Sequence, residues 1–171
     1  MKEGCTMRYG QLRQYDIANG EGIRTSLFVT GCTHCCYNCF NEEYQDFSAG
    51  KEWTESDTER LLSYVMAPAC SGLTLLGGEP FQNVDGLVPL VDRVLTVAPQ
   101  KPIWVYSGYT YEEILACPNK RQLLERSHIL VDGKFVDELR DPGLAFRGSS
   151  NQRIIDIQAS LEQGEVVLYL E

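Results

Sequence analysis

The stretch SLFVTGCTHCCYNCFN, residues 26–41, joins a short apolar run to a loop rich in cysteine. The run at residues 26–30 has the length and composition of a buried parallel strand. Directly after it, Cys32, Cys35, Cys36 and Cys39 fall within eight positions of a chain that has seven cysteines in all. The stretch therefore predicts a strand whose carboxyl end carries a metal or redox site.

The composition favours a single domain, residues 1–171, large enough to fold around a core without disulfides or structural metals. No segment resembles a signal peptide or is apolar for long enough to span a bilayer, so we expect a cytoplasmic protein with no membrane partner. In that reducing compartment a cysteine cluster indicates metal or redox chemistry. The net charge of −9, without a basic stripe, argues against nucleic acid as a partner.

Strands and helices are expected to alternate along the chain. After the first strand, the sequence predicts three more buried strands, at residues 72–76, 103–107 and 128–132. This alternation is typical of right-handed βαβ units and predicts an α/β fold, either an open sheet or part of a barrel. The tail differs, because residues 153–158 and 165–170 predict a β-hairpin that turns around Gln163 and Gly164.

The helices have recognisable starts. Thr54 followed by acidic residues predicts a helix start. The expected buried side of that helix is Leu61, Leu62, Val65 and Met66. Pro89 would break a helix interior, so the next helix is expected to begin near Leu87 with Pro89 in its first turn. Its expected buried face is Leu90, Val91, Val94 and Leu95. Shorter helices are predicted at residues 111–115 and 119–126.

Two interpretations of the cysteine loop compete. Two abutting CxxC pairs could place all four thiolates on one structural zinc ion. Structural zinc sites usually take their ligand pairs from separated parts of the chain, however, and here adjacent Cys35 and Cys36 would both have to face one ion. The alternative is CxxxCxxC, in which Cys32, Cys36 and Cys39 bind an iron-sulfur cluster. Three ligands on a four-iron cluster leave one iron open to a substrate or cofactor.

Buried thiols without a metal are a third interpretation, typical of isolated cysteines rather than of four in eight residues. His34 is interpreted as an ordinary loop residue. Cys5, Cys70 and Cys117 stand alone and are interpreted as packing or surface thiols.

The run LLGGEP places Gly77, Gly78 and Glu79 at the expected carboxyl end of the next strand. Glycines let a ligand lie against the backbone, and Glu79 could offset a positive charge. The same run is also typical of a tight strand-to-helix turn. Because the cysteine loop and GGEP follow successive parallel strands, both are expected to open on the edge where α/β ligand sites lie.

CxxxCxxC after one strand and GGEP after the next resemble the radical S-adenosylmethionine (SAM) superfamily. The ordered blocks NGEGIRTSLFVTGCTHCCYNCFN, LLGGEP, WVYSGYTYEEI, LVDGKF and RGSSNQRIIDIQASL cover most of the chain. They are similar to the activating proteins of the anaerobic (class III) ribonucleoside-triphosphate reductases. The resemblance implies a partial (β/α) barrel of parallel strands, the radical SAM core, with a 4Fe-4S cluster and SAM as cofactors.

The resemblance also implies a radical SAM activase, which cleaves SAM reductively and takes a hydrogen atom from a glycine of the large reductase subunit. The electron would come from a low-potential donor such as flavodoxin or ferredoxin. The implied metal ligands are Cys32, Cys36 and Cys39. The implied cofactor contacts are Asn38, Phe40, Gly77, Gly78, Glu79, Asp132 and Lys134. No catalytic side chain, such as a general base, is expected.

The chain departs from the superfamily pattern at three points. Asn38 stands where an aromatic residue is common, so Tyr37 or Phe40 would stack on adenine instead. Glu21 replaces a proline, and Cys35 is an additional thiol.

Several polar residues carry weaker expectations. Asp132 and Lys134 would hold the SAM carboxylate or a cation, with a solvated turn as the alternative. Arg24 would meet an acidic group near the cluster or form a surface ion pair. The remaining candidates for lining the cavity or contacting the partner are Ser107, Tyr109, Arg147, Ser149 and Ser150.

Other functions remain as alternatives. The nearest are an activase of a different glycyl-radical enzyme and a small-molecule radical SAM enzyme similar to 7-carboxy-7-deazaguanine synthase. An iron-sulfur electron carrier or a zinc-stabilised binding module would use the cysteines, but neither would have a use for GGEP.

Overall fold

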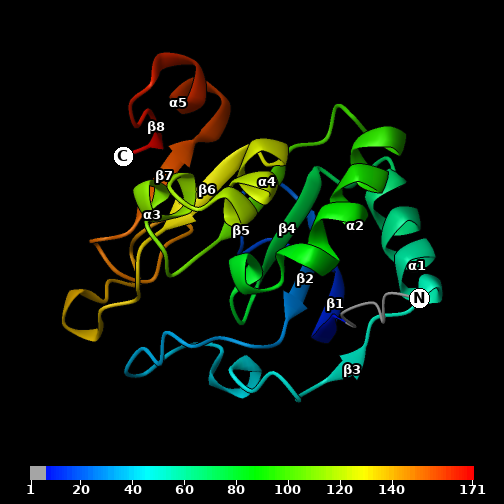
Figure 1. Ribbon diagram of the computed structural model, residues 1–171, viewed down its shortest axis with the longest axis horizontal. Coiled ribbons are helices and arrows are strands. Elements are labelled where there is room, and N and C mark those ends of the chain that lie inside the picture. Colours follow the sequence, from blue (N-terminus) through cyan, green and yellow to red (C-terminus); the bar gives the residue numbers. More distant parts are fainter. Residues whose placement is uncertain (1–6) are drawn as a thin grey trace.

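A computed structural model describes residues 7–171 and contains one mixed sheet of eight strands, in the order β3-β1-β2-β4-β5-β6-β7-β8 (Figure 1). The strands are β1 (Arg8–Asp16), β2 (Arg24–Val29), β3 (Lys51–Glu52), β4 (Gly72–Gly77), β5 (Ile103–Tyr106), β6 (Ile129–Asp132), β7 (Arg153–Asp156) and β8 (Leu168–Leu170). The helices are α1 (Glu55–Met66), α2 (Val84–Val97), α3 (Tyr111–Leu115), α4 (Pro118–Arg126) and α5 (Ile157–Gln163). Short 3-10 turns are η1 (Glu42–Tyr44), η2 (Pro80–Gln82) and η3 (Asp137–Leu139).

The centre of the sheet is parallel, as the sequence predicts. β2, β4, β5 and β6 pair in parallel, and all four lie where the apolar runs indicate. Antiparallel strands extend both sides, with β1 and β3 beyond β2 and with β7 and β8 beyond β6. The sequence pattern did not indicate β1, because several of its residues are partly exposed and polar. The pairing order leaves β3 and β8 at the two edges, so the structure is an α/β sheet in which closure into a barrel is not seen.

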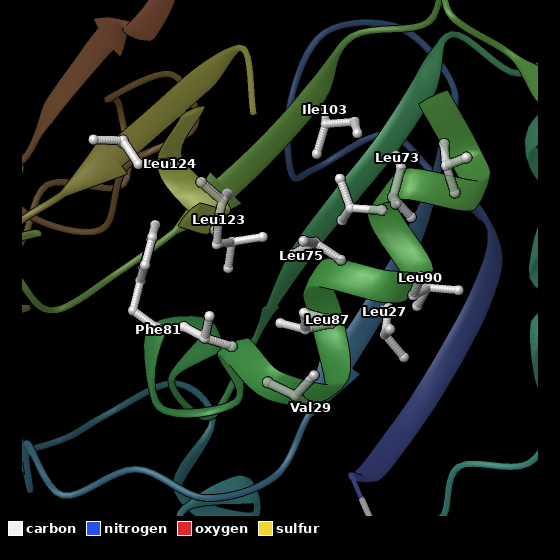
Figure 2. Close-up of a cluster of buried hydrophobic side chains, with 14 of the residues drawn as sticks. Leu27, Val29, Leu73, Leu75, Phe81, Leu87, Leu90, Ile103, Leu123 and Leu124 are labelled. Atoms are coloured by element: carbon white, nitrogen blue, oxygen red, sulfur yellow. The ribbon is translucent and has the colours of Figure 1, made fainter. Parts of the chain in front are cut away.

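Helices α1, α2 and α4 pack on one face of the sheet (Figures 1 and 2). Alternate strand residues supply that face, since side chains of a strand point to opposite sides in turn. The buried set around α2 includes Leu27, Val29, Leu73, Leu75, Leu87, Leu90 and Ile103 (Figure 2). Trp104, Val131 and Ile154 point to the opposite face and form a smaller cluster with Phe146 and Leu170. No helix within residues 7–171 is long and apolar enough to cross a bilayer.

Two helix predictions need correction. α2 begins at Val84, three residues before the expected start, because η2 leads directly into it and Val84 is already buried. Pro89 therefore lies in the second turn, on the exposed side, where its missing N–H costs the helix one hydrogen bond. In α1, Thr54 caps the helix as expected and Leu61 and Val65 are buried, but Met66 is 52% exposed.

The expected C-terminal hairpin is also different. β7 and β8 do pair antiparallel, but α5 lies between them. The Asp156 side chain accepts a hydrogen bond from Ala159 N–H (3.0 Å) and caps α5. Gly164 ends the helix at φ +75°, a left-handed conformation that glycine adopts without strain. The glycine is therefore a helix C-cap and not the turn of a hairpin.

Arg24 starts β2 at the end of the sheet opposite the cysteine loop. Its side chain is buried, and burial lowers its pKa to about 10. It donates hydrogen bonds to Thr74 Oγ1 (2.8 Å), Leu73 O (2.9 Å) and Pro102 O (2.6 Å). Both expectations for Arg24 were wrong, because the guanidinium joins the amino ends of the parallel strands.

Replacing Leu75 by Ala tests the helix-covered core. Leu75 is fully buried beneath α2, so the shortened side chain should lower the free energy of unfolding by about 2–5 kcal/mol. The measurement is anaerobic urea unfolding followed by circular dichroism. The control is Val97→Ala at the exposed end of α2, which should change stability by less than about 0.5 kcal/mol. Equal effects of the two changes would contradict this packing.

Stability should also depend on the protonation of His128. Its Nδ1 accepts a hydrogen bond from Ile103 N–H (2.9 Å), and burial, helped by Arg24, lowers its pKa below 6.5. The unfolded chain then binds more protons below about pH 6.5, so stability should fall as the pH drops through the folded-state pKa. His128→Asn keeps an acceptor without a titrating group, and it should flatten the stability profile between about pH 7 and 5. Parallel profiles for the two proteins would refute this role.

Candidate active site

A cavity of about 540 Å³ opens at the carboxyl ends of β2, β4 and β5. Parallel strands end at one edge of a sheet, so the loops that follow them meet there. The cavity wall includes Cys32, Cys36, Cys39, Gly77, Gly78, Glu79 and Ser107. The cysteine loop and GGEP, which the sequence predicts at one edge, thus lie on one cavity.

Glycines bring the cysteine loop against the end of β4. Glu79 N–H donates to Gly31 O (2.8 Å), and Gly78 N–H donates to Val29 O (2.7 Å). A Cβ on Gly78 would lie 2.6 Å from Gly31 O and 2.8 Å from Tyr44 O, which is too close for any side chain. Gly77 has φ +104°, which also favours glycine. The GG pair is therefore required for this packing, and its backbone still borders the cavity.

Three cysteines of the loop face the cavity and the fourth does not. Cys32, Cys36 and Cys39 are partly buried in its wall, whereas Cys35 is exposed and lies outside it. Cys35 and Asn38 have φ values of +53° and +54°. These two left-handed residues turn the backbone sharply on either side of Cys36. The CxxxCxxC set therefore shares one cavity without Cys35.

The cavity disfavours free thiolates at two of these positions. Burial raises the pKa of Cys32 to about 11. Burial, together with the nearby Cys39, raises the pKa of Cys36. Thiolates so placed need positive charge to be stable, which coordination to metal ions provides.

The donor set fits a multi-iron cluster better than a single ion. The four-cysteine zinc site would need all four sulfurs at bonding distance, but Cys35 is outside the cavity. Within residues 7–171 the structure places no three His, Cys, Asp or Glu side chains around one ion position. A cluster binds each sulfur to a different iron, so three cysteines around a broad cavity suit it. The structure describes no position for Cys5, which precedes residue 7.

Glu79 is the most heavily bonded side chain at this edge. Its carboxylate is 1% exposed and accepts hydrogen bonds from Ser107 Oγ (2.9 and 3.0 Å), Gly108 N–H (2.7 Å) and Phe81 N–H (2.9 Å). His34 Nε2 lies 2.7 Å from its Oε1. Sequence reasoning missed His34, which is 45 residues from Glu79 along the chain; only its place between Cys32 and Cys36 hinted at a role.

The structure places Asp132 and Lys134 outside the residues that line the cavity. Asp132 is buried outside the cavity, and its carboxylate accepts hydrogen bonds from Tyr111 N–H (2.7 Å) and from Arg153 Nε (3.0 Å) and Nη2 (2.5 Å). That pairing raises the pKa of Arg153. The Asp132 carboxylate thus links β6 to β7 through Arg153 and to α3 through Tyr111. Lys134 is exposed and does not line the cavity, although its charge acts on Cys36.

Among the expected aromatic contacts, only Phe40 lines the cavity. Its ring packs on Phe135, with centroids 4.9 Å apart, and Arg140 lies over it at 5.1 Å. Tyr37 is 76% exposed. Asn38 is also exposed and outside the cavity, since its left-handed backbone turns the chain there. Phe40 is itself 57% exposed, but it is the one of the two aromatic candidates that lines the cavity, so the structure favours it over Tyr37.

Arg147 supplies an unpaired donor to the cavity wall. Its Nη1 donates to Gln152 O (3.0 Å), whereas its Nε is the single buried side-chain nitrogen or oxygen without a hydrogen-bond partner in residues 7–171. Its neighbour Phe146 has φ +59°, which is rare for an aromatic residue. A buried donor without a partner costs stability, and it lies in a residue that lines the cavity.

One of the other polar candidates lines the cavity and the others do not. Ser107 lines the cavity and bonds Glu79, while the hydroxyl of Tyr109 accepts a hydrogen bond from Gln82 Nε2 (2.8 Å). Ser149 is buried and accepts a hydrogen bond from Val136 N–H (3.2 Å), so it holds the loop rather than facing the cavity. Ser150 is exposed. Cys70 is buried beside Gly72 as a packing thiol.

The comparisons with known proteins agree with this geometry. Residues 18–155 match a family model described as a 4Fe-4S single cluster domain. The chain is 42% identical over 152 residues to the anaerobic ribonucleoside-triphosphate reductase-activating protein of Pasteurella multocida, covering 86% of this chain and 96% of that protein. The protein of the same name from Escherichia coli K12 is 39% identical over 150 residues, covering 85% and 96%. The one from Enterobacteria phage T4 is 35% identical over 150 residues, covering 86% and 93%.

The fold and the site thus define a protein of the 4Fe-4S single cluster class. More narrowly, the chain belongs to the family of anaerobic ribonucleoside-triphosphate reductase-activating proteins.

Substitution of single cysteines tests the ligand set. Cys36→Ala removes a sulfur from the cavity wall and should abolish the cluster, whereas Cys35→Ala removes an exposed thiol and should leave it intact. Iron and sulfide content and the visible absorption spectrum after anaerobic reconstitution measure the outcome. Loss of the cluster in Cys35→Ala, with retention in Cys36→Ala, would overturn the assignment.

Proposed function

We propose that this protein is a radical SAM activase of an anaerobic ribonucleoside-triphosphate reductase, and that it generates a glycyl radical on the large subunit of that enzyme. The observation that carries the proposal is the meeting of three cysteines with the Gly77–Gly78 backbone on one cavity. The names of the relatives support the choice of partner. They favour this function over a small-molecule radical SAM enzyme, an electron carrier or an activase of another glycyl-radical enzyme.

Cys32, Cys36 and Cys39 would hold a 4Fe-4S cluster, and that cluster would supply the single electron for reductive cleavage of SAM into methionine and a 5′-deoxyadenosyl radical. Transfer of a hydrogen atom from the Cα of one partner glycine would then give 5′-deoxyadenosine and the glycyl radical. A low-potential protein donor such as flavodoxin or ferredoxin must supply the electron. The reducing cytoplasm would suit this chemistry.

The residues of this chain would bind and orient SAM. We assign its ammonium group to backbone carbonyls at Gly77 and Gly78, since the oxygens of Glu79 already accept hydrogen bonds from four donors. The charge of Glu79 still favours a cation nearby. Arg147 lines the cavity, and its guanidinium would offer a positive charge to the SAM carboxylate. Phe40 would pack on adenine, and Lys134 would add positive charge near Cys36.

The glycine on the partner suits the rest of the site. A glycine has no side chain to block the approach of C5′ to its Cα, and the flanking amides stabilise the radical. The cavity is open to solvent at the carboxyl edge of the sheet, where a loop of another protein would enter. The chain's part is to align SAM with that loop and to keep water and stray hydrogen donors away.

Two measurements on the wild-type protein test the proposal. The anaerobically reconstituted protein with SAM and a strong reductant should release 5′-deoxyadenosine. Incubation with the large subunit of an anaerobic ribonucleotide reductase should then give a glycyl-radical EPR signal. Protein with a full cluster that releases no 5′-deoxyadenosine would refute the radical mechanism. Release of 5′-deoxyadenosine without the EPR signal would refute the choice of partner.

A further inference from the structure

We propose that His34 is a positioning residue: by binding Glu79 it sets the placement of the cysteine loop relative to the Gly77–Gly78 backbone. The inference rests on the proposed function, in which SAM must reach both the cluster and that backbone. If the cysteine loop shifts relative to the Gly77–Gly78 backbone, SAM can no longer contact both the cluster and that backbone equally well. A side chain that fixes the two halves relative to each other therefore controls SAM binding.

The contact between His34 and Glu79 is short and shielded from water. Nε2 lies 2.7 Å from Oε1, and the side chains are 7% and 1% exposed. A carboxylate accepts hydrogen bonds, so Nε2 carries the proton and donates it. A buried carboxylate that loses a donor is destabilised. The remaining donors to Glu79 come from Phe81, Ser107 and Gly108. His34 is thus the member of the set that belongs to the cysteine loop.

The first part of the cysteine loop is held more firmly than the second. Beside His34, Thr33 N–H donates to Gln82 Oε1 (3.0 Å), and Gln82 Nε2 donates to Thr33 Oγ1 (2.7 Å). In contrast, the backbone hydrogen bond found within residues 35–39 is the one from Cys39 N–H to Cys36 O (3.3 Å). The loop is therefore attached to the sheet edge on the side of Cys32, through Thr33 and His34.

The space around the imidazole is shaped for it. A Cβ on Gly108 would lie 2.5 Å from His34 Cδ2 and 2.8 Å from Nε2, so a larger residue there would displace the ring. The ring also meets Tyr109 edge-on, with centroids 4.5 Å apart. Gly108 lies 74 positions after His34 and belongs to a different strand end, so it provides an independent way to disturb the contact.

Three variants of the full chain test the role. His34→Phe keeps a ring but removes the donor, His34→Gln keeps a donor, and Gly108→Ala displaces the imidazole without changing the cysteine loop. Each should bind iron and sulfide as the wild type does. His34→Phe and Gly108→Ala should raise the Kd for SAM about tenfold in equilibrium dialysis without reductant, and should weaken the SAM-induced change in the EPR spectrum of the reduced cluster. His34→Gln should stay within about threefold of the wild-type Kd.

The outcomes separate this inference from the proposed function. Wild-type Kd and EPR spectra in both His34→Phe and Gly108→Ala would overturn the positioning role while leaving SAM cleavage intact. Loss of the cluster in these variants would also overturn it, because His34 would then be needed to hold the metal. If His34→Phe does not fold, Gly108→Ala and His34→Gln decide the question. A wild-type protein that holds a cluster but neither binds nor cleaves SAM would defeat both proposals.

Discussion

The buried carboxylate of Glu79 is the interaction on which the site depends. It accepts donors from its own turn, from the end of β5 and from the cysteine loop, and it is 1% exposed. A charge removed from water is tolerated only when its hydrogen bonds are all made, so these three segments must lie where they are. The position of the loop that carries the cysteines follows from this requirement.

Packing on the two faces of the sheet explains why a cavity is there. Helices α1, α2 and α4 cover one face with a continuous apolar core. The opposite face has a smaller cluster around Trp104, against which Phe146 of the loop before β7 packs. Loops fill space less completely than a packed helix, and glycines at positions 77 and 78 let backbone approach backbone. At the carboxyl edge the cavity therefore opens beside a sheet whose other face is tightly packed.

The sequence patterns correctly predicted those features that depend on neighbouring residues in the chain. The apolar runs gave the four parallel strands, and the capping sequence at Thr54 gave the start of α1. Predictions failed where a distant contact outweighed the local pattern. Pro89 lies inside α2 because Val84 is already buried, and Asp132 is unavailable to a ligand because Arg153 and Tyr111 bind it. The tail contains α5 because Asp156 caps it.

The sequence by itself predicted the candidate ligands and the glycines: three cysteines at CxxxCxxC spacing and a GG pair after the next parallel strand. These follow from spacing along one strand-loop unit, which local geometry controls. Only the tertiary structure decided that Cys35 lies outside the cavity, that Arg147 Nε is buried without a partner and that His34 binds Glu79. The reason is that such contacts join residues far apart in the chain, and their energy depends on burial that exists only after the sheet has formed.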